Sequence, residues 1–289
     1  MTSASCELAD LGVLGIRGPD ALRFLQGQLS NDVAHLAPGG ALLAGLHNPQ
    51  GRTLALLRIG MPRPEVVLAV LPVDLAAALV AQLRKFVLRS KVAILDERTE
   101  WRVLGITGSA AAATSHELVL PLGTTPARAL AVLPVATGGG AARSPDAPLS
   151  RDAWRTLDIE AGLPQVYAAT SGAFVAQMLN LDVLGAVAFD KGCYTGQEVI
   201  ARAHYRGRIK RRMQRFRSRG PVTLAPGATG RMTDGRTYQV VDAVMQADGR
   251  AHFLAVSPVA AADETSVAPA GSDALLDCES LPLPYALPA

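Results

Sequence analysis

The segment KGCYTGQE, residues 191–198, has the residue types and spacing for thiol chemistry. Its cysteine, Cys193, follows Lys191 by two positions, and two glycines let the backbone bend or approach a ligand closely. Thr195 and Glu198 have the spacing of a capping box, which predicts the start of a helix. A helix N-terminus and a nearby ammonium group both stabilise a thiolate, the form that attacks electrophiles and binds metals. The segment therefore predicts a reactive or ligand-binding thiol at Cys193.

A second interpretation of Cys193 stays open, because cysteine is among the most often buried residues and commonly serves packing alone. No local spacing links it to a histidine as in a catalytic triad, and His204 lies too far along the expected helix to act as its base. The other cysteines, Cys6 and Cys278, are distant in sequence and form no C-x-x-C pair. We therefore expect neither a disulfide framework nor a complete metal site made of Cys and His.

A basic run follows the cysteine segment, with nine Arg or Lys among the eighteen residues 202–219. Two aromatic residues, Tyr205 and Phe216, lie within it. Such a run suits an RNA or anion groove, in which arginines bind phosphates and a ring stacks on a base. A solvated strand face is the simpler alternative. The candidate nucleic-acid or anion contacts are Arg202, Tyr205, Arg206 and Arg208.

Composition limits the function classes. The formal net charge of the 289-residue chain is only +3, which is low for a dedicated nucleic-acid-binding protein. No apolar run reaches the about 18 residues that a membrane helix needs, and the first ten residues do not resemble a signal peptide. We therefore expect a cytoplasmic protein that does not enter a membrane.

The hydrophobic patterns predict an α+β fold on a mostly antiparallel sheet, because short strands alternate with a few helices over short links. A Gly-, Pro- and Ser-rich stretch predicts a loop, and the residues from about Ile209 onward predict a small β-barrel. We expect two domains, 1–207 and 208–289. The predicted strands are 12–16, 41–46, 53–59, 66–71, 91–95, 102–106, 238–244 and 251–256; the predicted helices are 20–29, 73–86, 151–161 and 199–203; the predicted loop is 137–150.

The cysteine segment, followed by VIAR and HYRG, resembles the motif of the YgfZ family of folate-binding proteins. This family is related to the T-protein, the aminomethyltransferase of the glycine cleavage system. The resemblance spans nearly the whole chain and implies a T-protein-like α+β body around a central cavity, with a C-terminal β-barrel. The other runs that carry it are 18–32 with GPD and FLQGQLSND, NPQGR at 48–52, IEAGLP at 159–164, QMLNL at 177–181 and LPLPY at 281–285.

The resemblance also implies a function and a set of site residues. The cavity would hold tetrahydrofolate or a derivative, and the protein would assist the assembly or repair of iron–sulfur proteins, with a link to tRNA modification. Trp154 matches an aromatic residue that lines the folate site, and Leu11 stands near the place of a second family tryptophan. Glu160 and Glu198 are candidate carboxylates for the pterin edge. The motif residues carried over are the functional thiol Cys193 with Lys191, Gly192, Tyr194, Gly196, Gln197 and Glu198.

One departure argues against T-protein chemistry. The T-protein has an aspartate in the turn that corresponds to 48–53, whereas this chain has no acid there. Aminomethyl transfer needs a group that manages a proton at the folate nitrogen. The leading hypothesis is therefore a folate-binding accessory protein. In it, Cys193 ligates iron or a cluster transiently, or exchanges redox equivalents.

A single thiolate cannot hold a cluster alone, so any cluster would be shared with a client or carrier protein, a second copy or a small thiol. Two other functions stay open. The first is a folate-dependent one-carbon transferase, which would use the same cavity but requires turnover. The second is an RNA-binding module built on the basic run, with tRNA as a contact.

Overall fold

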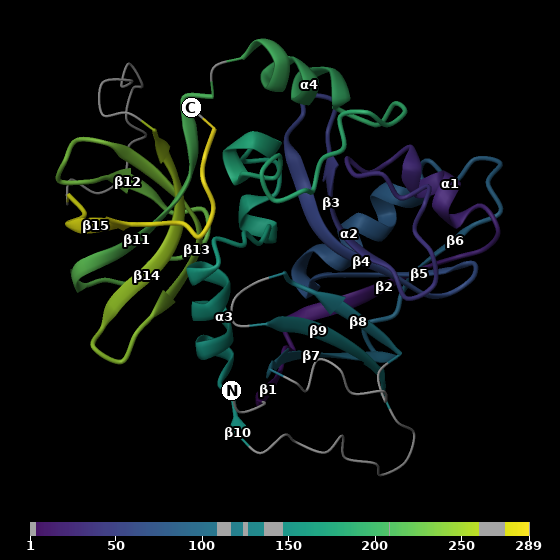
Figure 1. Cartoon of the computed structure of the whole chain (residues 1–289), viewed down its shortest axis with the longest axis horizontal. Helices are drawn as coiled ribbons and strands as arrows, with labels where there is room; N and C mark the ends of the chain where they lie inside the picture. The colour runs from purple at the N-terminus through teal and green to yellow at the C-terminus, as the bar shows by residue number, and fades with distance from the viewer. Residues whose placement is uncertain are drawn as a thin grey trace. The chain divides into compact units, whose positions relative to one another are not determined.

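The computed structural model describes residues 4–108, 117–123, 127–135, 147–207, 209–259 and 275–288. The chain divides into two compact units, and both are interleaved in sequence (Figure 1). The expected loop at 137–150 falls mostly outside the described residues. The compact units divide the chain at other positions than residue 207. The expected domain boundary there stays a prediction. Unit 1 comprises Met1–His47, Ala55–Trp154 and Ala186–Thr195, and unit 2 comprises Asn48–Leu54, Arg155–Gly185 and Gly196–Ala289.

The first sheet contains five of the predicted strands. Its order is β3-β4-β5-β2-β6, and β5 pairs antiparallel with both β2 and β4. Strand β2 is buried along most of its length, because it pairs with β5 on one side and with β6 on the other. The bounds are β2 (Leu11–Arg17), β3 (Ala41–His47), β4 (Thr53–Arg63), β5 (Val66–Pro72) and β6 (Ala93–Asp96).

A second sheet, of order β10-β1-β7-β9-β8, lies in unit 1. Only its strand β7 was predicted from the sequence. Strands β1 and β8 have four residues each and β10 has two, which is too short for a visible alternation of apolar and polar residues. The bounds are β1 (Ala4–Glu7), β7 (Trp101–Thr107), β8 (Leu118–Pro121), β9 (Arg128–Pro134) and β10 (Ala147–Pro148).

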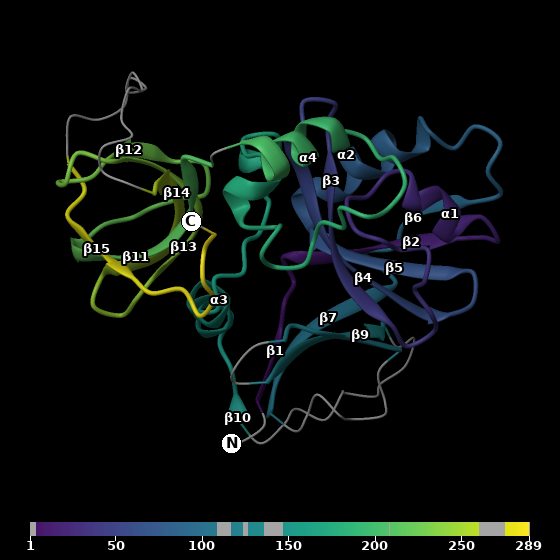
Figure 2. The same ribbon diagram turned by 45° about the horizontal axis from the view of Figure 1, so that its top comes forward.

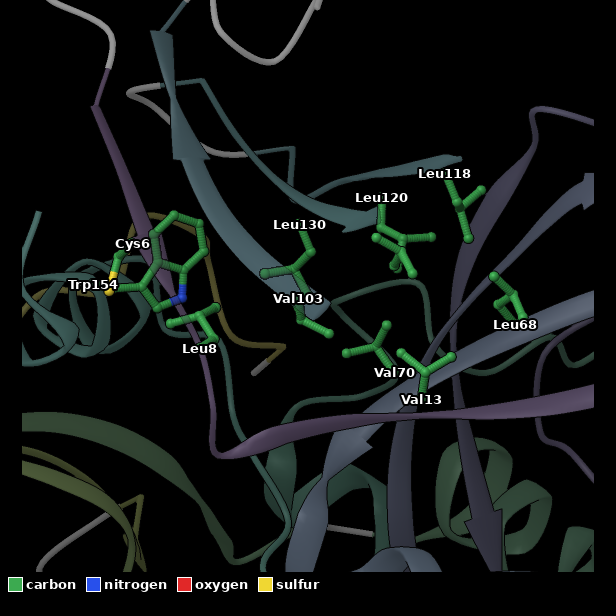
Figure 3. Packing of buried hydrophobic residues seen from close by; sticks show 11 residues of the cluster. Cys6, Leu8, Val13, Leu68, Val70, Val103, Leu118, Leu120, Leu130 and Trp154 are labelled. Atoms are coloured by element: carbon green, nitrogen blue, oxygen red, sulfur yellow. The ribbon is translucent and has the colours of Figure 1, made fainter. Parts of the chain in front are cut away.

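The apolar faces of these two sheets share one core (Figure 3). Val13, Leu68 and Val70 come from the first sheet, whereas Val103 and Leu130 come from the second. Helix α2 (Val73–Arg84) packs against β2, β5 and β6, and it buries residues spaced three or four apart. The core and α2 therefore hold the first sheet from both faces.

Unit 2 contains a five-stranded antiparallel sheet of order β12-β13-β14-β11-β15. A parallel bridge between Met232 and Leu276 joins its two edges, so the sheet is barrel-like, as Figure 2 shows. Phe216 and Phe253 stack in its interior. The predicted α+β class with a small C-terminal β unit is confirmed. The bounds are β11 (Arg211–Pro221), β12 (Thr229–Arg231), β13 (Thr237–Met245), β14 (Arg250–Pro258) and β15 (Cys278–Leu281).

The helices differ from the predictions mainly at their ends. α1 (Ala21–Gln26) is shorter than expected, and α3 (Arg151–Glu160) is close to its predicted range. The predicted capping box is wrong: α4 (Gln197–Arg206) has Gly196 as its N-cap and no side-chain cap hydrogen bond. Gly196 adopts a left-handed φ of 83°, which places it against the turn that begins at Asn48. No helix in the described part of the chain is long and apolar enough to span a membrane.

Candidate functional site around Cys193

At the start of the cysteine segment, two exposed residues lie between two buried ones. Lys191 and Tyr194 are buried, whereas Gly192 and Cys193 between them are exposed. Packing therefore does not explain Cys193. The chain's other cysteines differ, because Cys6 is buried and Cys278 is half-buried. Burial raises the pKa of the Cys278 thiol to about 11, and burial also raises the pKa of Cys6. Cys193 is thus the thiol that solution reagents reach first.

The ammonium group of Lys191 is directed at backbone carbonyls. Its Nζ donates to the carbonyl oxygens of Gln26 at 2.9 Å, Leu29 at 2.6 Å and Asn31 at 2.7 Å. Desolvation lowers the pKa of Lys191 to about 8, although the nearby Asp32 carboxylate opposes this shift. The positive charge of Lys191, expected from the sequence to lie beside the thiol, is thus bound by carbonyls at the end of α1 and in the turn after it.

Tyr194 packs between Lys191 and a buried histidine. Its ring centroid lies 5.2 Å from the Lys191 Nζ and 6.3 Å from the His47 ring centroid. Burial raises the pKa of Tyr194 to about 12. His47 is only 2% exposed, and neither of its ring nitrogens has a hydrogen-bond partner in the structure as described. Desolvation lowers the pKa of His47 to about 3, so its imidazole is neutral.

Trp154 and Leu11, the two apolar residues expected at a folate site, both belong to the packing of one hydrophobic core. Trp154 belongs to the core of unit 1, and Leu11 packs against the same core. The Trp154 ring covers the backbone of Gly105, where a Cβ would collide with it, and the Arg128 Cζ lies 4.9 Å from the ring centroid. The ring is only 2% exposed and packs beside Cys6 and Leu8 in this core (Figure 3).

An acid beside these walls was missed by sequence reasoning. Asp10 precedes Leu11, and its Oδ2 pairs with the Arg151 Nη2 at 2.8 Å. Its Oδ1 is buried without a hydrogen-bond partner among the described residues. An unpaired buried carboxylate oxygen can accept a hydrogen bond from a ligand N–H. The only sequence signal was its position next to Leu11, at the start of a strand.

The remaining folate candidates belong to unit 2. The Glu160 Oε1 lies 3.8 Å from the Arg215 Nη2, so its carboxylate has a cationic neighbour. Glu198 is exposed in the first turn of α4, and Gln197 beside it is half-buried. Gly196 is fixed by packing, because a Cβ there would overlap the carbonyl oxygen of Asn48.

Several motif residues of unit 2 build its scaffold. The Asn180 Nδ2 donates to the carbonyl oxygen of Met213 at 2.9 Å and lies 3.3 Å from the Tyr285 hydroxyl. That hydroxyl donates to the carbonyl oxygen of Gly162 at 2.7 Å. The runs 159–164, 177–181 and 281–285 thus meet at one hydrogen-bonded node. Their shared role is to tie the C-terminal segment to the rest of the unit.

A buried carboxylate holds a second node. The Asp242 Oδ2 accepts from the Tyr167 hydroxyl at 3.0 Å, and its Oδ1 pairs with Arg155 and accepts from the Ala243 amide at 2.8 Å. Burial raises the pKa of Asp242, while the Arg155 guanidinium opposes the shift. This node fastens α3 to strand β13 within unit 2.

The basic run divides into two parts with different roles. In β11, Phe216 is fully buried in the barrel-like core, so the interpretation that it stacks on a base is wrong. Four of the strand's five arginines pair with carboxylates, whereas Arg211 donates to the Thr237 hydroxyl at 2.8 Å. These pairs are Arg212–Asp182, Arg215–Glu160, Arg217–Glu279 and Arg219–Asp277.

The helical part of the run faces solvent. Arg202, Tyr205 and Arg206 are exposed at positions i, i+3 and i+4 of α4, so they share one helix face. Tyr205 is 68% exposed, and its ring meets the His204 ring edge-on with 4.9 Å between their centroids. Arg208, the fourth candidate contact, lies outside the described residues. No group of three or more His, Cys, Asp or Glu that could hold a metal occurs among the residues that were placed.

Comparisons with known proteins identify the family. No protein-family model matches the chain. A tRNA-modifying protein YgfZ from Klebsiella pneumoniae (strain 342) is 33% identical over 270 residues, which covers 84% of this chain and 81% of the relative. The protein of the same name from Serratia proteamaculans (strain 568) is 31% identical and covers 97% and 92%.

An uncharacterized protein from Haemophilus influenzae (strain ATCC 51907 / DSM 11121 / KW20 / Rd) is 31% identical over 214 residues, covering 73% of this chain and 72% of the relative. Among solved structures, the glycine cleavage system aminomethyltransferase T from Bartonella henselae superposes with a TM-score of 0.68 at 16% identity. It covers 89% of this chain and 79% of that one, and this likeness shows the fold. The expected resemblance is thereby confirmed, and the chain belongs to the YgfZ family with an aminomethyltransferase-like fold.

Proposed function

We propose that this protein binds tetrahydrofolate or a derivative and supports iron–sulfur proteins that take part in tRNA modification. The names of its relatives support the link to tRNA modification. The observation that carries the proposal is the exposure of Cys193. It lies with Gly192 between the buried residues Lys191 and Tyr194. An exposed thiol with buried supports on both sides suits a transient contact with a partner.

The folate part of the proposal is supported by the residues of unit 1. Leu11, which packs partly buried against the core that contains Trp154, offers an apolar contact, and the unpartnered Asp10 Oδ1 offers an acceptor for the N–H groups of a pterin edge. These residue types fit the ligand. Tetrahydrofolate would supply a one-carbon carrier. The chain would orient it through Asp10 and contact it through the apolar side chain of Leu11.

The same arrangement favours an accessory role over aminomethyl transfer. The turn that lacks the T-protein acid begins at Asn48, whose Oδ1 accepts from the amides of Gln50 and Arg52 at 3.0 Å each. The polar side chain at this turn therefore stabilises the turn itself. The carbonyl oxygen of an amide also cannot take up a proton near neutral pH. This turn therefore lacks a general acid or base for aminomethyl transfer.

The role proposed for Cys193 is limited by the number of ligands that one thiolate can supply. One thiolate offers one bond to iron, so a cluster would be completed by thiols of a client or carrier protein, a second copy or a small thiol. The other cysteines are poor substitutes, because burial raises the pKa values of Cys6 and Cys278. Cys193 would therefore act alone within this chain.

Folate binding is tested by titrating the purified protein with tetrahydrofolate and following tryptophan fluorescence. We expect saturable quenching that weakens in Asp10→Asn and Trp154→Ala. Asp152→Asn, an exposed acid on the same helix as Trp154, is the matched control and should leave the Kd unchanged. Absent quenching in the folded wild-type protein would overturn the folate part of the proposal.

The thiol is tested in cells that lack the protein, by assaying an iron–sulfur enzyme of tRNA modification after complementation. We expect Cys193→Ala to fail and Cys278→Ala, the half-buried control, to restore activity. Full activity with Cys193→Ala would overturn the role of the thiol.

A second candidate function is direct RNA contact through α4. It is favoured by the exposure of Arg202, Tyr205 and Arg206 on one helix face. Replacing both arginines by alanine should lower tRNA affinity and reduce the slope of log K against log salt by about 1 per lost phosphate contact. Lys85→Ala with Arg89→Ala removes two exposed cations of unit 1 and is the control for net charge. Equal losses in both variants would mean that net charge alone drives binding and would exclude a specific α4 surface.

A further inference from the structure

The ammonium group of Lys191 closes the C-terminal end of α1. Gln26 is the last residue of that helix, and Leu29 and Asn31 lie just beyond it. All three offer carbonyl oxygens within 2.9 Å of the Lys191 Nζ. An ammonium has three N–H donors, so each carbonyl receives one. A cation is also favoured where a helix leaves its last carbonyls unpaired.

This contact joins distant parts of the chain. The partners of Lys191 precede it by 160 to 165 residues. The same turn is fixed to the first sheet, because the Ser30 amide donates to the carbonyl oxygen of Gly45 at 2.9 Å. It also contacts the chain just before the cysteine segment, since the Ala188 amide donates to the Ser30 carbonyl oxygen at 2.9 Å. Lys191 is therefore bound to a turn that is itself hydrogen-bonded to the first sheet.

Tyr194 provides a second anchor on the other side of the cysteine. Its ring is buried and lies 5.2 Å from the Lys191 Nζ. Between the anchors, a Cβ at Gly192 would meet nothing within 4 Å. The exposed pair Gly192 and Cys193 is therefore not held by packing at Gly192. Its position depends on the residues that flank it.

We propose that Lys191 is a positioning residue: bound by the carbonyls of Gln26, Leu29 and Asn31 and backed by Tyr194, it fixes the outward direction of the Cys193 thiol. This inference rests on the proposed role of Cys193 as the working thiol. The thiol so presented suits a thiophilic centre held by a partner, such as iron or a soft electrophile. Lys191 acts on that centre only through the cysteine.

The anchor is tested by hydrogen–deuterium exchange on the full chain. The amides of Gln28, Leu29 and Ser30 are hydrogen-bonded, so their exchange can be followed. We expect Lys191→Met, which keeps the apolar stem without the charge, to speed exchange in 26–32 and 191–195 together by about ten-fold or more. Lys210→Met removes an exposed lysine and should change neither segment. Unchanged exchange in 26–32 with Lys191→Met would overturn the proposal.

A conservative variant gives a second readout. Lys191→Arg keeps the charge, but its planar guanidinium cannot point donors at three converging carbonyls in the way an ammonium does. We expect it to fall between the wild type and Lys191→Met. Should Lys191→Arg leave both segments as protected as in the wild type, the three converging ammonium hydrogen bonds would not be what holds them, and the proposal would fail.

The direction of the thiol is measured with a nitroxide spin label on Cys193. The label selects this residue, because burial raises the pKa values of both other cysteines. We expect a narrow set of label positions in the wild type and faster, broader motion in Lys191→Met. Identical spectra in the two proteins would show that Lys191 does not position the thiol.

Complementation separates this inference from the function on which it rests. Lys191→Met should lower iron–sulfur enzyme activity in cells, and the double variant with Cys193→Ala should be no worse than Cys193→Ala alone. An additional loss in the double variant would mean that Lys191 acts independently of the cysteine. Full activity with Cys193→Ala would overturn the proposed function, whereas the exchange and spin-label results would still decide the role of Lys191.

Discussion

The Arg212 guanidinium forms a two-pronged ion pair with the Asp182 carboxylate in the interior of unit 2. Its Nη1 and Nη2 donate to the two carboxylate oxygens at 3.0 Å and 2.9 Å. The two side chains are only 4% and 6% exposed. The Nη1 also meets the carbonyl oxygen of Gln177 at 3.1 Å. The most buried arginine of the basic run is thus part of the scaffold.

Breaking this pair should destabilise the protein strongly. We expect Asp182→Asn to lower the free energy of unfolding by about 3–5 kcal/mol, because it leaves a buried guanidinium without its counter-charge. The control is Asp277→Asn, whose pair with Arg219 is exposed at 58% and 62% and should contribute less than about 1 kcal/mol. Urea unfolding measures both. Equal small effects would show that the Arg212 pair is solvated in solution.

Gly162 should resist substitution for two separable reasons. Its φ is +63°, and an added Cβ would lie 2.7 Å from Leu283 and 2.8 Å from the Tyr285 hydroxyl. We expect Gly162→Ala to cost about 1–2 kcal/mol for the left-handed backbone and about 1–3 kcal/mol more for the crowding. Gly235→Ala is the matched control, because Gly235 has a φ of +90° with nothing within 4 Å. Thermal unfolding that shifts equally in both variants would remove the crowding contribution.

His47 should make stability depend on pH. Its pKa is about 3 in the folded protein, against about 6.5 when unfolded. Between these values the unfolded chain binds the extra proton, so this residue lowers the free energy of unfolding by about 1.4 kcal/mol per unit as pH falls below 6.5. Above 6.5 both states are neutral and the contribution is constant.

The variant His47→Leu isolates this contribution. It should flatten the pH dependence of urea unfolding between pH 4.5 and 6.5, whereas His35→Leu, at an exposed position, should keep the wild-type slope. His47→Leu should also be neutral or stabilising near pH 5, because it removes a buried group whose nitrogens lack partners among the described residues. A wild-type slope in His47→Leu would contradict the assignment.

The sequence predicts those parts of the fold that local patterns determine. Strand β5 follows from an unbroken run of apolar residues and helix α2 from apolar residues at a period of 3.6, and both were placed within two residues. Strands β1 and β8 were missed, since four residues show no period and their pairing comes from distant segments. Length alone does not decide the outcome, because the seven-residue β9 and the eleven-residue β11 were missed as well.

The candidate site shows the same limit. The motif indicated Cys193, but its exposure depends on burial of its neighbours, which no local pattern reveals. Arg217 belongs to the basic run that suits an anion groove, yet it pairs with Glu279, 62 residues later. Asp10 was overlooked because its unpartnered oxygen is a property of the folded core. Long-range pairing decides which charges of such a sequence remain for a ligand.

The two glycines of the cysteine segment should respond oppositely to substitution. Gly196 has a φ of +83°, and a Cβ there would overlap the Asn48 carbonyl oxygen and lie 3.1 Å from the Gly51 Cα. Backbone atoms cannot move aside cheaply, so Gly196→Ala should cost about 3 kcal/mol or more and loosen α4 from this turn. Gly192 has no positive φ and open space around it.

We therefore expect Gly192→Ala to keep the wild-type free energy of unfolding within about 0.5 kcal/mol, or to raise it slightly through the unfolded chain. Urea unfolding and exchange of the α4 amides measure the difference between the two variants. A glycine that tolerates alanine structurally but abolishes complementation would show that Gly192 is kept for close approach of a partner to Cys193. A Gly196→Ala variant as stable as the wild type would instead mean that α4 is not fixed to the turn at Asn48 in solution.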